Sequence, residues 1–419
     1  MLFLVVVVGL FLLSESRQRP CATVDDAFGD WLSMNAPRPA HREFTPLTLF
    51  AINDNSVANG HPMPWDPVQY ALFPRAILPF SPEVVAIDEV LDWKGLPMDP
   101  AERQKLPQYE TMLSNWLLKC PKLLLAARLG WPEDPENIPP IEEAPLIRKV
   151  KGDIRPIPEW TVIEQQPKDE FRLTATTGFT NIPAVNGPVN SVPLLLRYRG
   201  EVAPSFVLQA ILLWQKLSTE DVTVEMGSHI SLAGKMEIPI GPAGEMRVNF
   251  GALRTRIAFD DLLLANEQIE AKQKPVAPVD RIKGGIALLA RTDAPSRTIP
   301  LAMGKMGSEG ELFSAAIATI QEQVFIKRAP YWFDFALIGV AALFALRIPR
   351  WRKGLVAAGA LLAIIVYTVG ALAWFSYQRV WVPGVLPAGL AIFVTLYRMA
   401  TPNFQPQLVL PPVESVSEL

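Results

Sequence analysis

Oxygen-bearing side chains cluster where two apolar segments of the first hundred residues end. Asp54 follows the short apolar strand expected at Leu47–Ile52, and Asp88 follows a second expected strand at Glu83–Ile87. If both runs are parallel strands, their carboxyl ends meet at one edge of the sheet, where ligands bind in open α/β folds. Carboxylate, amide and hydroxyl oxygens at that edge would bind a cation or a polar ligand. The candidate ligand-binding residues are Asn53, Asp54, Ser56, Trp65, Asp88 and Glu89.

The same side chains also have a structural interpretation, which the sequence leaves open. Asp and Asn residues that follow strands often cap turns and loop backbones. Trp65 has prolines close on both sides in the chain. A tryptophan in this position can either stack against a ligand or fill the edge of the core.

No combination of residues predicts catalysis or a bound cofactor. The histidines His41, His61 and His229 have no second metal ligand at helical or hairpin spacing, and a metal site needs three or four ligands. The chain contains no nucleophile elbow, phosphate loop or zinc signature. We therefore expect no enzymatic activity, no metal and no cofactor. The enzymatic alternative is a hydrolase on the outer face that uses Asp54, Asp88 and a divalent metal.

The net charge bears on the possible partners, and the two cysteines bear on a possible disulfide. The net charge is −3 and no basic patch stands out, so nucleic acid is not an expected partner. The two cysteines, Cys21 and Cys120, could form a disulfide in an oxidising compartment. Cys120 lies on the apolar side of an expected helix, where a thiol behaves as a small apolar group. The sequence does not decide whether the two cysteines pair.

Alternating strand and helix signals predict an α/β domain before the C-terminal region. Asp66 is well placed as an N-cap and Pro67 as the first helical residue. Continuous apolar strands that alternate with helices are typical of a mostly parallel sheet with both faces covered by helices. The expected strands and helices are Leu47–Ile52, a helix from Pro67 limited by Pro74 and Pro79, Glu83–Ile87, helix Tyr109–Cys120, Leu123–Ala127, Val192–Tyr198, a helix capped by Ser205, helix Asp261–Ile269, Ile286–Ala290 and helix Glu311–Gln323.

Two further segments of this domain have distinct signals. Lys235–Ile240 and Glu245–Phe250 alternate polar and apolar residues around a Gly-Pro-Ala-Gly turn, which favours a β-hairpin. Pro132–Pro167 shows no sustained period, so we expect a surface loop there.

Three apolar stretches near the C-terminus predict transmembrane helices at Tyr331–Leu346, Gly354–Phe375 and Val380–Tyr397. The loop Arg347–Lys353 carries four basic residues, so it is expected in the cytoplasm. The residues before Tyr331 then lie outside and the chain ends inside. Asp334 falls at the outer interface, where we expect it to reach toward water.

The N-terminal apolar segment Leu2–Leu13 is short for a membrane span and is followed by Arg17 and Arg19. It is either an uncleaved anchor helix or a signal-like segment, and the sequence does not decide between them. The expected organisation is residues 1–19 as this segment, 20–329 as the outer domain, 330–398 as three transmembrane helices and 399–419 as a short, disordered cytoplasmic tail.

The order of these features resembles CHASE2, an extracytoplasmic sensory domain of bacterial signalling proteins. The resemblance rests on Leu49–Asp54, Met63-Pro64-Trp65, Val84–Asp88, Gly178–Asn181 with the return strand at Val192, and Met246–Gly251 followed by Phe259-Asp260-Asp261. The sequence departs from the family pattern at Asn53, where one member of an acidic pair is expected, and at Ala290–Thr292. After Arg398 only 21 residues follow, so we expect no cytoplasmic effector domain after the helices.

The resemblance implies a sensor in the bacterial inner membrane with its main domain in the periplasm. An outer ligand or envelope protein would bind this domain, and the membrane helices would relay the change to a separate signalling protein, through the bilayer or through the tail. A homodimer is compatible with this arrangement. The alternatives are the hydrolase described above and an envelope scaffold that senses nothing.

Overall fold

The fold is known from a computed structural model of the whole chain. It describes residues 21–36, 45–59, 63–96, 99–132, 143–183, 188–293, 298–301, 305–347 and 353–400. The N-terminal segment 1–19, the middle of the basic loop Arg347–Lys353 and the tail lie outside the described residues. The chain divides into two compact units, one formed by residues 33–327 and one by the described residues up to Leu32 together with those from Arg328 onward.

A seven-stranded sheet forms the centre of the unit from Ser33 to Lys327. Its path is β15-β1-β16-β2-β3-β6, and β7 also pairs with β3. All its pairs are parallel except β3 with β6. The mostly parallel mixed sheet expected from the sequence is therefore confirmed. The strands are β1 (Leu47–Ile52), β2 (Val84–Ile87), β3 (Leu123–Gly130), β6 (Val162–Gln165), β7 (Thr176–Phe179), β15 (Thr255–Ala258) and β16 (Ile286–Arg291).

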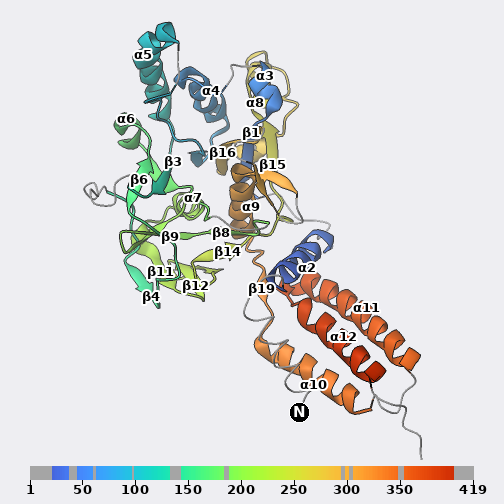
Figure 1. Cartoon of the computed structure of the whole chain (residues 1–419). Helices are drawn as coiled ribbons and strands as arrows, with labels where there is room; N and C mark the ends of the chain where they lie inside the picture. Colours follow the sequence, from blue (N-terminus) through green and yellow to red (C-terminus); the bar gives the residue numbers. More distant parts are fainter. Residues whose placement is uncertain are drawn as a thin grey trace, which may run out of the picture. The chain divides into compact units, whose positions relative to one another are not determined.

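Helices cover both faces of this sheet, as continuous apolar strands require (Figure 1). One face packs against α4 (Pro67–Ile77), α5 (Pro100–Leu117) and α8 (Phe259–Glu270). The other packs against α7 (Phe206–Gln215) and α9 (Glu309–Gln321). Alternate residues of each strand enter the two cores: in β1, Phe50 packs with the first group of helices and Leu49 with the second.

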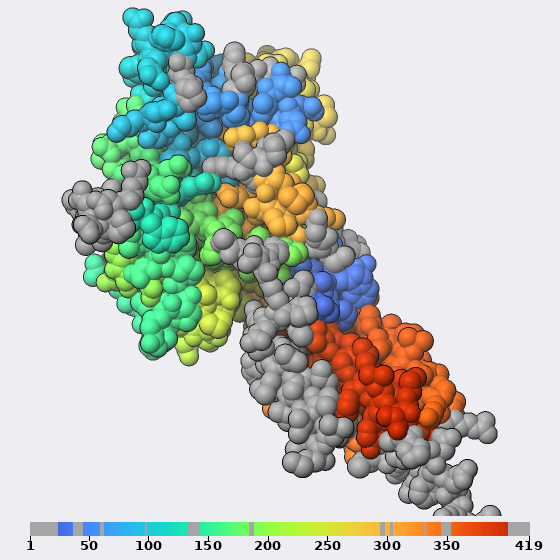
Figure 2. Space-filling model, in the orientation of Figure 1, coloured from blue at the N-terminus to red at the C-terminus, as the bar shows by residue number. Residues whose placement is uncertain are grey.

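Helix starts follow the expected capping chemistry. Asp66 accepts a hydrogen bond from Gln69 N at 3.0 Å and Pro67 begins α4, as predicted. Pro74 does not limit this helix but lies inside it. Helix α5 starts nine residues before the expected position, because Asp99 caps it and Pro100 occupies its first turn. Most of α5 is exposed, and Figure 2 shows it as a projecting cyan ridge.

The smaller sheets contain two corrections to the sequence analysis. The expected hairpin between Lys235–Ile240 and Glu245–Phe250 is wrong: β13 (Met236–Pro239) pairs with β12 (His229–Leu232), and β14 (Glu245–Arg247) pairs with β8 (Ser191–Pro193). The turn between them therefore passes the chain from one sheet to another.

The Pro-rich stretch Pro132–Pro167 also contains strands rather than only loop. These are β4 (Lys149–Lys151), β5 (Glu159–Trp160) and β6, and each pairs with a distant segment, so no local period reveals them. The other strands of the small sheets are β9 (Leu195–Tyr198), β10 (Glu201–Pro204), β11 (Val222–Glu225), β17 (Thr298–Pro300) and β18 (Met306–Ser308); the remaining helices of this unit are α3 (Asp54–Asn59) and α6 (Asp169–Arg172).

The other unit contains α10 (Tyr331–Arg347), α11 (Lys353–Gln378) and α12 (Val385–Ala400), together with most of α2 (Cys21–Asn35). Of the described helices, α11 is long and apolar enough to cross a bilayer, whereas the apolar parts of α10 and α12 are shorter. The third apolar helix starts at Val385 rather than Val380, because Val380–Trp381 forms strand β20. Strand β19 (Lys327–Arg328) precedes α10.

Candidate ligand-binding edge of the sheet

The carboxyl edge of the sheet brings together the ends of β1, β2 and β16. After β1, Asn53 caps α3: its Oδ1 accepts hydrogen bonds from Ser56 N at 3.0 Å and from Ser56 Oγ at 3.2 Å. Asp54 is exposed in the first turn of α3, where its negative charge interacts favourably with the positive end of the helix dipole. Asn53 and Ser56 therefore have the capping role, and Asp54 is the one of the three whose side chain faces solvent.

Trp65 belongs to an aromatic core beneath this edge. It is 1% exposed, and its ring lies against Tyr70 and Phe259 with centroids 5.7 and 5.2 Å away. Its carbonyl accepts a hydrogen bond of 2.7 Å from Trp93 Nε1. Such burial matches the core-filling role considered from the sequence.

Asp88 is buried, 2% exposed, and lies against the first turn of α9. Its backbone N–H continues the strand ladder by donating to Leu289 O at 2.9 Å. A Cβ added to Gly310 would lie 3.5 Å from Asp88 Oδ2 and only 2.2 Å from Ala290 Cβ. Glycine at position 310 therefore lets the start of α9 approach both β16 and the Asp88 carboxylate closely.

Two ion pairs bind the start of α9 to the strands of the sheet. Arg128 of β3 donates to Glu309 Oε2 at 3.1 Å, and Arg256 of β15 pairs with Glu311. Glu311 also closes a capping box with Ser308, so the same carboxylate caps the start of α9 and pairs with Arg256 of β15. Both pairs are partly exposed, which limits each to about 1 kcal/mol.

A third pair follows β16 at the same edge. Arg291 donates from Nε and Nη2 to Asp293 at 2.9 and 2.6 Å. The hydrogen bonds to Asp293 raise the pKa of Arg291, and Glu89 adds to this effect from the loop after β2. The predicted residues Asp88 and Glu89 thus lie at the same edge as three ion pairs that the sequence analysis did not identify.

A pocket of about 350 Å³ opens beside Glu311. Its wall is mixed: Arg254 and Lys305 bring positive charge, and Phe250 and Met306 bring apolar surface. Such a lining suits a small anionic ligand with an apolar part. The remaining lining residues are Met34, Gly251 and Leu301.

The predicted site residues do not surround one metal position. Within the part of the chain that the structure describes, no group of three or more His, Cys, Asp or Glu side chains could hold a metal ion. Cys120 is a free thiol whose Sγ lies 3.7 Å from Trp116 O, and burial raises its pKa to about 12. A thiol with so high a pKa stays protonated at neutral pH and is a poor nucleophile.

Comparison with known proteins gives the family. A family model for the CHASE2 domain matches residues 2–347, from the first apolar segment to the end of α10. The chain belongs to the CHASE2 family. CHASE2 domains are extracytoplasmic sensory domains, so the resemblance found in the sequence is confirmed. Neither a curated protein nor a solved structure matches the chain.

The unit that contains α10, α11 and α12 also differs from one expectation. Asp334 does not reach toward water: it is fully buried, and its Oδ2 accepts a hydrogen bond of 2.9 Å from Arg328 Nη2. The arginine comes from the strand just before α10, six residues earlier.

Proposed function

We propose that this CHASE2 protein is a membrane-anchored sensor that acts without catalysis. A polar ligand or an envelope protein binds at the carboxyl edge of the sheet, and α9 relays the change toward the membrane helices. One observation carries the proposal. The start of α9 forms ion pairs with β3 and β15 at the candidate edge, and nine residues separate the end of α9 from the start of α10.

The ion pairs at the start of α9 make it a suitable relay. A charged ligand group that binds Arg256 competes with Glu311 for the same guanidinium. Because each pair contributes only about 1 kcal/mol, ligand binding can replace them. The rest of α9, from Leu312 to Ile320, is buried, so a shift at its start is transmitted along a rigid helix.

Membrane anchoring places this sensor in the bacterial inner membrane with the sheet outside. The support is the apolar α11 and the basic residues that flank its start. The output passes to a separate signalling protein, through the membrane helices or through the tail after Ala400.

The experiment measures hydrogen exchange of α9 in the full-length protein in detergent. Arg256→Glu and Glu311→Arg should each raise exchange in the first turns of α9. The double variant should restore part of the protection that Glu311→Arg loses, because the ion pair forms again with its charges reversed while the capping box with Ser308 stays lost. Arg155→Glu is the matched control, since Arg155 forms an exposed pair with Asp153 away from α9. Equal exchange in all variants would remove the support for α9 as the relay.

The hydrolase alternative makes a different prediction. Titration calorimetry with Mg²⁺ or Ca²⁺ alone should then show binding that Asp54→Ala with Asp88→Ala abolishes. The sensor proposal expects no such metal binding. If a variant carrying both changes keeps its stability and its signalling output, these two carboxylates are not part of the ligand site.

A further inference from the structure

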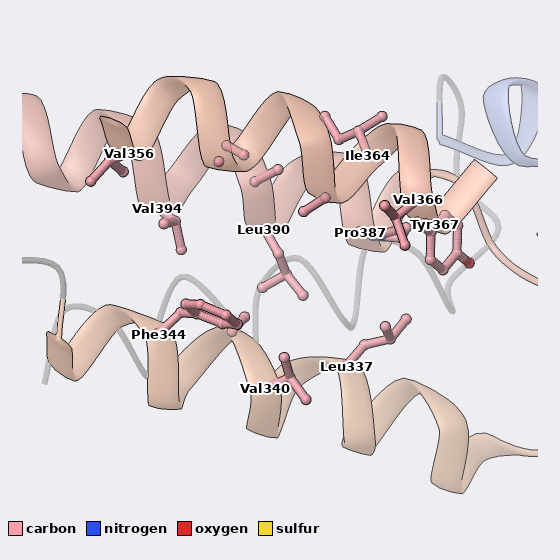
Figure 3. A pocket seen from close by; sticks show the side chains of 15 residues that line it. Leu337, Val340, Phe344, Val356, Ile364, Val366, Tyr367, Pro387, Leu390 and Val394 are labelled. Carbon is pink, nitrogen blue, oxygen red and sulfur yellow. The ribbon is translucent and has the colours of Figure 1, made fainter. Parts of the chain in front are cut away.

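Two of the cavities that the structure describes differ in the ligands they could recognise. One is a groove of about 410 Å³ between α10, α11 and α12 (Figure 3). Among its lining residues only Tyr367 carries a polar side-chain atom, and its hydroxyl already donates to Pro383 O at 2.6 Å. This groove therefore offers no group that could recognise a charged ligand. The other is the pocket of about 350 Å³ beside Glu311, whose lining carries both charge and apolar surface.

One wall of this pocket is a loop that is hydrogen-bonded to α9. Asn249 N donates to Thr319 Oγ1 at 3.0 Å, and Leu253 N donates to Glu322 Oε1 at 2.9 Å. Because both bonds hold the loop against the end of α9, this wall is formed before any ligand binds, which lowers the cost of binding. The pocket-lining residues of the loop are Phe250, Gly251 and Arg254.

A second wall is the antiparallel pair of strands β17 and β18. Just beyond the paired residues, Leu301 N donates to Lys305 O at 2.7 Å. Gly307 of β18 lets this wall approach the start of α9, because a Cβ there would overlap Leu301 Cδ1 and lie 2.7 Å from Glu311 Oε2. The pocket-lining residues of this wall are Leu301, Lys305 and Met306.

The charges of the pocket lining favour an anion. Its acid is Glu311, whose carboxylate already pairs with Arg256 and accepts a hydrogen bond of 3.3 Å from Ser308 N. Its bases are Arg254 and Lys305. In the part of the chain that the structure describes, the Lys305 ammonium forms no ion pair. The lining thus carries two positive charges against one negative charge that Arg256 compensates, and a small anion would be attracted to it.

The apolar surface of the pocket is partly open to water. Met306 is 63% exposed, whereas Leu301 of the same wall is 8% exposed. A ligand with an apolar chain would remove this surface from water, which is favourable. Methionine is flexible and makes favourable contacts with aromatic rings. At about 30 Å³ for each water-sized group, the pocket volume holds a ligand of about ten non-hydrogen atoms.

We propose that this pocket binds a monocarboxylate with a short aryl or alkyl chain, of about ten non-hydrogen atoms in all. The carboxylate lies with the Arg254 guanidinium and the Lys305 ammonium, and the chain covers Phe250, Leu301 and Met306. The bound ligand connects the loop before β15 with the β17–β18 pair, beside the start of α9. This inference names a ligand class for the proposed sensor, and its link to signalling rests on that proposal, whereas the binding itself does not.

The test is titration calorimetry of the full-length protein in lipid nanodiscs with 3-phenylpropanoate. Two further probes separate charge from shape: 3-phenylpropanamide keeps the shape without the charge, and acetate keeps the charge without the apolar chain. We expect 3-phenylpropanoate to bind about ten-fold more tightly than either, the effect of one charge-assisted hydrogen bond. Equal affinity for 3-phenylpropanoate and its amide, or no binding of 3-phenylpropanoate at millimolar concentration, would overturn the proposal.

Variants locate the bound carboxylate. Arg254→Gln and Lys305→Gln should each weaken the binding of 3-phenylpropanoate about ten-fold, because each removes one charged donor. Lys305 is exposed, so Lys305→Gln should leave urea unfolding unchanged and keep the test free of folding effects. Lys235→Gln is the matched control, since Lys235 is also exposed and does not line the pocket. Binding that Lys305→Gln weakens no more than Lys235→Gln does would place the ligand elsewhere and refute the inference.

Hydrogen exchange of α9 distinguishes a failure of this inference from a failure of the relay. If 3-phenylpropanoate binds with the expected selectivity and leaves exchange in the first turns of α9 unchanged, the pocket is a ligand site and α9 is not its relay. If 3-phenylpropanoate does not bind while the Arg256 and Glu311 variants still change this exchange, the pocket inference is wrong and the relay proposal stands.

Discussion

Asp25 and Gly384 lie 359 positions apart in the chain, yet Asp25 Oδ1 accepts a 2.7 Å hydrogen bond from Gly384 N. Val385 N donates to the same oxygen at 2.7 Å, so a residue of α2 caps the first turn of α12. Asp25 Oδ1 therefore satisfies backbone donors that the start of a helix leaves open.

We expect Asp25→Ala to lower the stability of the unit that contains α2 and α10 to α12 by about 2 kcal/mol, because two hydrogen bonds to a buried carboxylate are lost. Thermal unfolding of the full-length protein in detergent measures the loss. The control is Val24→Ala, whose parent side chain is 54% exposed on the same helix. An equal effect of the two changes would contradict a capping role for Asp25.

The pH dependence of the same contact has a definite sign. Burial raises the pKa of Asp25, although the hydrogen bonds from Val385 N and Gly384 N partly oppose this. The folded protein then binds this proton more tightly than the unfolded chain, so folding gains stability as the pH falls through the raised pKa. Melting of the wild type and of Asp25→Asn at neutral and mildly acidic pH should show their difference shifting in favour of the wild type at lower pH.

Gly310→Ala should destabilise the outer domain by about 1–3 kcal/mol, because the new Cβ would overlap Ala290 Cβ. Urea unfolding gives the change in free energy. Adding Ala290→Gly removes the overlapping methyl group and should recover part of the loss. If the loss of unfolding free energy in the double variant equals the sum of the two single losses, Gly310 is not needed for the close approach of α9 to β16.

Reporter fusions test the membrane topology. A reporter inserted near residue 250 should be active outside the cytoplasm, and one after Tyr397 should be active inside, because basic short loops stay in the cytoplasm. Replacing Arg347, Arg350, Arg352 and Lys353 with alanine should increase the fraction of inverted chains. A cytoplasmic signal at residue 250 would refute the proposed orientation.

Truncation after Thr401 separates two routes for the output. If a partner binds the tail, the shortened protein should insert normally and lose co-purification with that partner. If the membrane helices carry the signal, co-purification should survive truncation. Immunoprecipitation from solubilised membranes, with insertion checked by reporter activity, distinguishes the two.

The layout of the main sheet could be predicted because its signals are local. Strand β1 has the predicted bounds Leu47–Ile52, since its six residues, five of them apolar, are all buried. Asp66 and Ser205 cap the predicted helices for the same reason: a cap depends on residues within one turn. The hairpin prediction failed because β14 pairs with β8, more than fifty residues earlier in the chain, and local alternation of residues does not reveal such a distant partner.

The candidate site was only partly predictable. Asp88 and Glu89 could be identified because they follow a strong strand, but Arg128 and Glu309 are 181 positions apart and meet only in the fold. Nothing near Arg128 in sequence distinguishes it from a surface arginine. The burial of Asp334 was mispredicted because an acid in an aromatic interface usually reaches water, whereas here Arg328 neutralises it.

Because Asp25 of α2 caps α12, the residues before Ser33 and those after Lys327 form one unit. In sequence, the outer domain is therefore an insertion into that unit. Two covalent tethers, one before Ser33 and one after Lys327, connect it to that unit. A domain held at two points cannot swivel freely about one bond. In the proposed sensor, a ligand-induced change in the separation or twist of the two ends would act on both connections together. A flexible spacer inserted in either connection should then uncouple ligand binding from the output.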